Sequence, residues 1–404
     1  MNRLLGALVF CMTVPAAAVA QDFGSDWIDQ VTHELQTERG PLKTRAVNGN
    51  ATGGVAYHFD DNVFLTEDDE ESSSVVIPFV AGRIDYATQR FEVQAQLLAN
   101  YKWYNSDDVD ADDDEERLYV RARQTDARYT LEFAEILQKV SDPLGAVFVD
   151  RVDRVVSNTV LHGAFDFTKQ WAVELGANLQ LVRFDKDQFS DPTDNNNVRA
   201  DLAVVYRTFW SFDALAQVGY QDIAYNGSQS QGAPPDAFGY YARLGYRGEL
   251  IQSLSVEAFA GYAHIETDFF QGTDLDDEGN TMDASFALRY EATEKVKFSA
   301  DYTRQFAFAI GEPFQIVNRF MLIENWEVTP QVGLKGRLQF DHVDTSSGTE
   351  RDYLSAAIST SWKAMEKLLV DGGFTWRTGD TDFSTGADTE FDNFIVHFGA
   401  AYNW

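Results

Sequence analysis

The sequence is poor in cysteine. The chain of 404 residues has a single cysteine, Cys11, which lies within the first 20 residues. Those residues combine one positive charge at Arg3, a short apolar run and a closing Ala-Val-Ala, which predicts a cleaved secretory signal peptide over 1–20. The mature chain would then contain no thiol. The sequence therefore excludes disulfide bonds and cysteine–metal sites as sources of its stability.

Long hydrophobic runs and basic residues are also scarce. After residue 20 the chain has no apolar run of roughly 18 residues, so we expect no helical membrane span. The chain has 32 Lys and Arg against 64 Asp and Glu, a net charge of −32. Nucleic acid is an unexpected partner, because binding phosphates needs a basic surface. The nine prolines form no Pro-rich hinge, and we expect one large domain over 51–404.

Residues 21–50 are predicted to form a short periplasmic segment that contains a helix. Val31 and Leu35 lie on one helical face with Trp27 or Ile28. We favour packing of this helix beneath the rim of the following domain. Entry into the domain as a plug, or docking of a periplasmic partner, are the alternatives.

The chain is rich in aromatic residues, which recur with a two-residue period. Aromatic content is 14% and hydrophobic content 44%, too high for a disordered chain. Apolar and polar side chains alternate in segments such as 91–103, 198–206 and 238–246. Successive side chains of a strand point to opposite faces of a sheet, so each segment is predicted to be a strand with one apolar face.

A soluble sandwich would show the same alternation, but three features favour a membrane barrel. Many runs reach about ten residues, long enough for a tilted strand to cross a bilayer. Their apolar faces begin and end in Trp, Tyr or Phe, which is typical of the two membrane interfaces. Short turns alternate with long polar loops. We predict a closed antiparallel transmembrane β-barrel of about 18 strands, with short periplasmic turns and long extracellular loops.

The last predicted strand keeps this period to the final residue, with aromatic side chains at Phe394, Phe398, Tyr402 and Trp404. It should pair with the first strand, around 53–59, because an open sheet edge in lipid would leave backbone groups unsatisfied. This ending also resembles the terminal strand of bacterial outer-membrane barrels. The resemblance implies that the four aromatic residues form a signal read by the barrel assembly machinery.

A barrel of this width is too wide for its own side chains to fill, so its polar face should line an aqueous lumen. Parity places the following arginines on that face, along the candidate solute path: Arg121, Arg123, Arg199, Arg207, Arg243, Arg247, Arg289 and Arg337. One hypothesis concerns a ladder for anionic solutes formed by Arg199, Arg207, Arg243 and Arg247. Arginine's planar fork suits carboxylates and phosphates. We favour the alternative, in which these arginines pair with acids on neighbouring strands.

Negative charge is concentrated in the predicted loops. Segments 60–71 and 107–116 are full of carboxylates and contain no basic residue. Such clusters can bind Ca²⁺ or Mg²⁺, and 274–280 resembles the start of an EF-hand loop, although Ser285 occupies the position of its bidentate glutamate. The candidate metal ligands there are Asp274, Asp276 and Glu278. We favour a solvated surface in contact with outer-membrane lipid and lipopolysaccharide, and we predict no cofactor.

One stretch, residues 57–108, resembles the front of the β-barrel porin type 2 family. The similarity begins with Asp-Asp-Asn-Val-Phe at 60–64 and continues through an acidic loop, a strand containing Pro78, a short turn and a Tyr-rich strand. Members of that family are often associated with exopolysaccharide systems. The resemblance therefore implies a conduit for polysaccharide or other large hydrophilic solutes, with export components as partners. It supplies no catalytic residues.

The leading prediction is a porin-like channel for hydrophilic solutes in the bacterial outer membrane, with exopolysaccharide export as its sharper form. A non-conducting structural or adhesive barrel is one alternative, and a barrel hydrolase is another. A hydrolase needs a Ser–His–acid set. The six histidines are isolated in the sequence and none lies near a nucleophile motif, so we predict no enzymatic activity.

Overall fold

The computed structural model describes residues 46–62, 72–105, 113–140, 153–184, 194–208, 212–226, 236–267, 278–307, 314–346, 348–382 and 388–404. The predicted signal peptide and the predicted helix within 21–50 lie outside these residues. The first strand begins at Ala46, ahead of the predicted domain boundary at 51. Across the described ranges, the structure contains no helix long and apolar enough to cross a membrane.

The described residues form one 18-stranded sheet. In chain order its strands are β1 (Ala46–Asp60), β2 (Ser73–Ala87), β3 (Phe91–Tyr104), β4 (Asp113–Thr125), β5 (Tyr129–Val140), β6 (Arg154–Asp166), β7 (Trp171–Phe184), β8 (Asn195–Arg207), β9 (Phe212–Tyr225), β10 (Ala237–Ile251), β11 (Leu254–Thr267), β12 (Glu278–Glu291), β13 (Val296–Ala307), β14 (Gln315–Thr329), β15 (Val332–Thr345), β16 (Glu350–Met365), β17 (Leu368–Asp382) and β18 (Asp388–Asn403).

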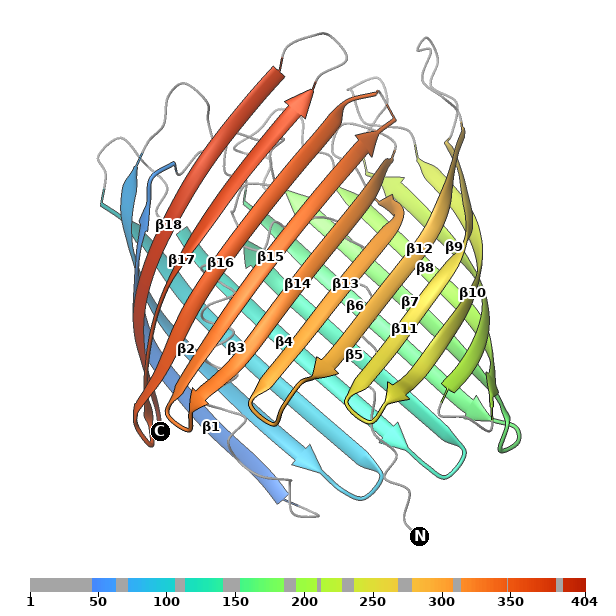
Figure 1. Cartoon of the computed structure of the whole chain (residues 1–404), viewed down its shortest axis with the longest axis horizontal. Helices are drawn as coiled ribbons and strands as arrows, with labels where there is room; N and C mark the ends of the chain where they lie inside the picture. The colour runs from blue at the N-terminus through green and yellow to red at the C-terminus, as the bar shows by residue number, and fades with distance from the viewer. Residues whose placement is uncertain are drawn as a thin grey trace.

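The sheet is a closed antiparallel barrel, as predicted (Figure 1). Each strand pairs with its neighbours in the chain, and β1 closes the sheet against β18. The closing register runs from Gly53 opposite Tyr402 to Phe59 opposite Val396, within the segment that the sequence singled out. Closure matters because it leaves no row of unpaired backbone groups at a sheet edge.

The two ends of the barrel differ in their connections. At the end where β18 stops, the turn end, strands are joined by short turns, and Figure 1 shows the C-terminus there. Two of these turns, Gln252–Ser253 and Pro330–Gln331, were not identified from the sequence. A threonine hydroxyl accepts two backbone N–H groups in each of four turns, at Thr88, Thr168, Thr293 and Thr329. These local bonds satisfy turn backbone that has no strand partner.

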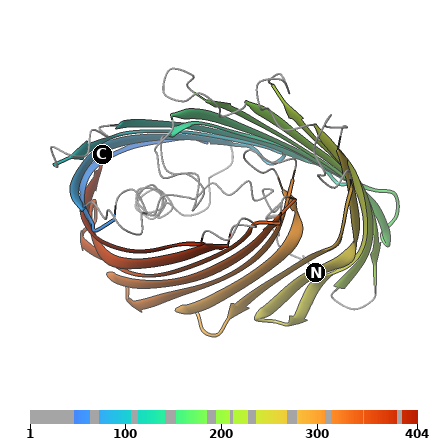
Figure 2. The ribbon, with the colours of Figure 1, turned by 90° about the horizontal axis from the view of Figure 1, so that it is seen from above.

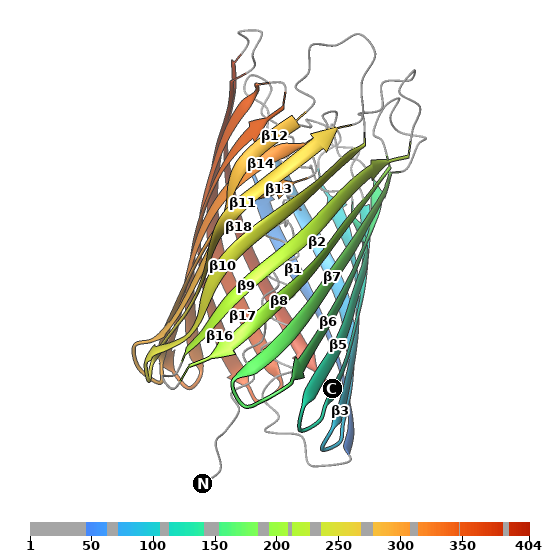
Figure 3. The same ribbon diagram turned by 90° about the vertical axis from the view of Figure 1, so that its right-hand side faces the viewer.

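The outer surface carries an apolar band on steeply tilted strands (Figure 3). On β10, Tyr240 and Leu244 point outward, and Leu244 is 71% exposed. Exposed aromatic side chains follow the turn end around the barrel: Tyr86, Phe91, Trp171, Tyr290, Trp326, Trp362, Tyr402 and Trp404. Amphipathic rings favour a membrane–water interface, so this surface suits a barrel surrounded by lipid.

The inner wall is less uniformly polar than the sequence predicted. On β2, Ile77 and Phe79 are buried on the lumen side, while Val76 and Val80 are exposed on the outer side. They pack in one cluster with side chains from β1, β3, β17 and β18. Strand β2 is therefore apolar on both faces over part of its length, because its inward side chains pack on neighbouring apolar groups instead of on lumen water.

The barrel is flattened in cross-section and curves most sharply at the green-to-yellow strands β9 to β11 (Figure 2). Glycines permit close approach on the concave side of this bend. A Cβ at Gly261 would meet the carbonyl oxygen of Ala242 and the Cα of Arg243 on β10, and one at Gly219 would meet the ring of Tyr241. The bend brings side chains of non-neighbouring strands together and so creates the site described next.

Candidate functional site

The candidate site is a group of lumen-facing side chains inside this bend, here called the corner cluster: Glu174 (β7), Arg199 (β8), Asp213 (β9), Tyr241, Arg243 and Arg247 (β10), Asp283 (β12) and Gln305 (β13). Tyr241, Arg243 and Arg247 share one face of β10 because they occupy alternate positions. The cluster joins β7 through β13 across the inside of the bend.

Arg199 lies at the centre of the cluster and is buried. Its Nε donates to the Tyr241 hydroxyl at 3.1 Å and its Nη1 donates to Gln305 Oε1 at 3.0 Å. Its guanidinium also stacks over the Tyr241 ring, 4.3 Å from the centroid. Strands β9 to β12 separate β8 from β13 in the sheet, so the bond to Gln305 crosses the inside of the bend.

Arg243 and Arg199 share one acceptor. Arg243 Nη1 donates to Asp283 Oδ1 at 3.0 Å, and Arg199 Nη2 lies 3.6 Å from Asp283 Oδ2. Asp283 is only 3% exposed, and its charge is compensated by the two guanidinium groups. The Arg243 guanidinium also lies over the ring of Phe259, at 4.5 Å, which holds it by a cation–π contact.

Arg247 bridges to the opposite side of the bend. Its Nη2 donates to Glu174 Oε1 at 2.8 Å and lies 3.4 Å from Asp213 Oδ2. Strands β8 and β9 separate Glu174 from Arg247 in the sheet. The three arginines are thus balanced by three carboxylates within contact distance, and their forks are held in fixed orientations. The arrangement presents a charged but locally neutral wall, along which an anion competes with Asp and Glu for each guanidinium.

The structure brings together three members of the hypothetical arginine ladder and separates the fourth. Arg207 lies near the turn end and pairs with Asp166 at 2.6 Å. Other predicted lumen arginines also have partners: Arg121 and Arg123 lie 2.9 and 3.8 Å from Glu132, Arg289 lies 2.8 Å from Asp301, and Arg337 donates to Gln339 at 2.7 Å. This geometry agrees with the cross-strand pairing that we favoured. The role of these arginines in solute passage stays a prediction.

Two side chains of the cluster were not selected from the sequence. Tyr241 shares the parity of Arg243, so its inward position could have been found, but its contact with Arg199 depends on the bend. Gln305 gave no signal, because its partner lies on a strand five places away in the sheet.

The predicted assembly residues lie on the outer face of β18. Phe394, Phe398, Tyr402 and Trp404 are all exposed there, and the rings of Tyr402 and Trp404 meet edge to face at 6.1 Å. The Trp404 backbone N–H donates to the Ala51 carbonyl at 2.9 Å, which ties the end of the chain to β1. These positions suit an aromatic rim, and recognition by assembly machinery stays a prediction.

Two of the candidate metal ligands, Asp274 and Asp276, lie outside the described residues. Glu278 is the first residue of β12 and is exposed. Within the described part of the chain, no group of three or more His, Cys, Asp and Glu side chains could hold a metal ion.

Several solved outer-membrane proteins have similar folds. Pseudomonas aeruginosa OpdK, solved with vanillate, is 10% identical over 88% of this chain and 99% of its own, with a TM-score of 0.48. The FrpB iron transporter of Neisseria meningitidis is 8% identical over 92% and 83%, with a TM-score of 0.46. Acinetobacter baumannii OccAB3 is 9% identical over 88% and 100%, with a TM-score of 0.45. No protein-family model and no curated protein matches the chain.

Proposed function

We propose that this protein is a porin-like channel that passes hydrophilic solutes across the bacterial outer membrane, with its turn end in the periplasm. One observation carries the proposal. On β10, Leu244 is exposed on the apolar outer surface, while its neighbour Arg243 is paired with Asp283 on the inner wall. An apolar exterior and a charged interior on the same strands suit lipid outside and water inside.

The test is conductance of the purified, refolded barrel in planar bilayers, together with swelling of liposomes loaded with neutral sugars. We expect discrete current steps and swelling that depends on sugar size. Protein unfolded by heat before addition serves as the control and should give neither. A folded barrel that produces no current and no swelling would contradict the proposal and favour a structural or adhesive barrel.

The finer proposal concerns the solute. The resemblance of residues 57–108 to a family associated with exopolysaccharide supports a conduit for polysaccharide, with export components as partners. Deleting the gene should then lower the extracellular polysaccharide and leave the intracellular precursor pool intact. Unchanged secretion in the deletion strain would remove this refinement and leave the channel for small solutes standing.

We also propose that the terminal aromatic residues direct assembly through the barrel assembly machinery. Phe398→Ala should lower the amount of folded barrel in the outer membrane in cells. Refolding of the same variant in detergent should be nearly unchanged, because the side chain makes its contacts on the outer surface. Equal loss in both settings would indicate a purely structural role.

A further inference from the structure

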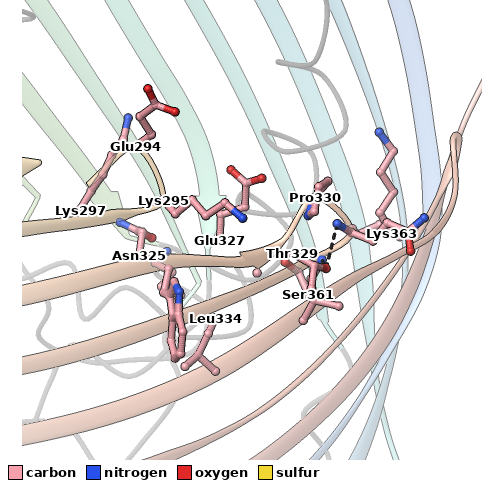
Figure 4. Close-up of a pocket in the computed structure, with 16 residues that line it drawn as sticks. Glu294, Lys295, Lys297, Asn325, Glu327, Thr329, Pro330, Leu334, Ser361 and Lys363 are labelled. Carbon is pink, nitrogen blue, oxygen red and sulfur yellow. Dashed lines mark hydrogen bonds between the residues drawn. The ribbon is translucent and has the colours of Figure 1, made fainter. Parts of the chain in front are cut away.

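A second polar site lies at the turn end, away from the corner cluster. A hollow of about 400 Å³ opens there among the ends of β13 to β16 and the turns that join them (Figure 4). Lys297, Asn325 and Lys335 stand directly opposite one another across β13, β14 and β15. Lys297 has the parity of Asp301, and Lys335 has the parity of Arg337, so this row is on the lumen side.

The hollow has a local excess of positive charge. Four lysines line it, against two glutamates: Lys295, Lys297, Lys335 and Lys363, with Glu294 and Glu327. The excess of two positive charges (four minus two) stands out in a chain whose net charge is −32. Lys297 lies 3.3 Å from Glu291, but both side chains are more than half exposed, and such a pair is easily exchanged for another anion.

The backbone around the hollow is well held. The Glu327 N–H donates to the Lys295 carbonyl at 2.8 Å, and the Lys363 N–H donates to the Gln331 carbonyl at 2.8 Å, so adjacent turns are bonded to neighbouring strands. The space depends partly on Gly333. A Cβ at this position would lie 2.9 Å from Ser361 Oγ. A large side chain at residue 333 would therefore occupy the hollow.

We infer that this hollow binds an organic anion that carries several carboxylate or phosphate groups. The lysines lie on separate strands spaced by about 5 Å, so their charges spread over roughly 10–15 Å and match several anionic groups better than one. Ammonium groups on flexible stems can contact oxygens from several directions. The inference deepens the proposed channel function, because it names a solute class and a contact site at the turn-end mouth, and it relies on that function for the solute's route.

The contrast with the corner cluster supports this assignment. In the cluster, Arg199, Arg243 and Arg247 meet a carboxylate for each positive charge, so an incoming anion must displace Asp or Glu. In the hollow, the lining lysines outnumber the lining glutamates, and an added anion lowers the repulsion between them.

The binding test uses citrate as the probe and calorimetry on the folded, detergent-solubilised barrel. The triple variant Lys297→Gln, Lys335→Gln, Lys363→Gln keeps most of each stem and removes three charges. We expect the citrate dissociation constant to rise about tenfold, a few-fold for each exposed charge contact. Lys169→Gln, in the turn between β6 and β7 and outside the hollow, is the matched control and should bind like the unmodified chain. Gly333→Leu should weaken binding by filling the space.

Citrate binding that is absent, or that weakens equally in Lys169→Gln and in the triple variant, would overturn the assignment. If the triple variant does not fold, Gly333→Leu decides the matter, and unchanged affinity in that variant overturns the assignment too.

The transport test adds citrate to one side of a bilayer that contains oriented barrels. Citrate on the turn-end side should reduce the current at lower concentration than citrate on the loop side, and the triple variant should remove this difference. A barrel that binds citrate but carries no current would refute the channel and keep the site. A conducting barrel that neither binds citrate nor is blocked by it would refute the site and keep the channel.

Discussion

The outer surface and the corner cluster are built from the same strands but depend on opposite physical effects. On the outer surface, side chains such as Leu244 and Trp362 are exposed and are stabilised only when lipid surrounds them. In the corner cluster, Arg199 and Asp283 are buried and are stabilised only when each finds a partner of opposite charge. Successive residues of β10 therefore tolerate opposite kinds of substitution. A charge is damaging on the outside, and loss of a charge is damaging on the inside.

The largest effect is expected inside. Asp283→Ala leaves Arg199 and Arg243 without their shared carboxylate in a buried position, and removing one partner of a buried ion pair costs about 3–5 kcal/mol. Urea unfolding in detergent micelles measures the loss. Asp283→Asn, which keeps an acceptor oxygen, should recover part of it. A loss below about 1 kcal/mol, the range of an exposed pair, would mean that lumen water screens the cluster.

A charge on the outer surface should cost somewhat less. Leu244→Arg places a guanidinium in the apolar band, where basic side chains cost about 2–4 kcal/mol at mid-depth. The loss should appear as weaker folding into phospholipid vesicles, followed by the shift in mobility between folded and heat-unfolded protein on gels. Ser359→Arg, which faces the lumen beside Lys335, is the control and should fold normally. Equal defects in both variants would argue against lipid outside and water inside.

The smallest effect is expected at the edge of the lumen. Arg207 and Asp166 form a pair at 2.6 Å, but their side chains are 36% and 33% exposed. Water screens such a pair, so Arg207→Ala should change the free energy of unfolding by less than about 1 kcal/mol. The same urea titration used for Asp283→Ala provides the measurement. A loss as large as that of Asp283→Ala would place Arg207 functionally with the corner cluster.

Sequence reasoning predicted the repeating features of the fold. The strand period, the closure of β18 on β1 and the 18-stranded antiparallel architecture were all expected, and the structure confirms them. The turns at Gln252–Ser253 and Pro330–Gln331 were missed because two-residue connections give little compositional contrast with the strands on either side. The apolar inner face of β2 was missed because a lumen wall was assumed to meet water everywhere.

The candidate site was predicted only in part. Parity placed Arg199, Arg243 and Arg247 on the inner wall, and the neighbouring acids made pairing the favoured interpretation. It could not indicate that Arg207 lies apart from them, or that Gln305 completes the coordination of Arg199. Those contacts depend on how sharply the sheet bends between β8 and β13, which no strand encodes by itself.

The sequence alone determined which side chains of each strand face lipid and which face the interior, because a strand's period of two is a local property of the backbone. It also determined that the ends of the sheet must meet, because lipid offers no partner to an open edge. Only the tertiary structure decided which interior charges meet. The flattened shape of the barrel arises from close packing at positions such as Gly219 and Gly261 on different strands, and ion pairs across the bend exist only once that packing has formed.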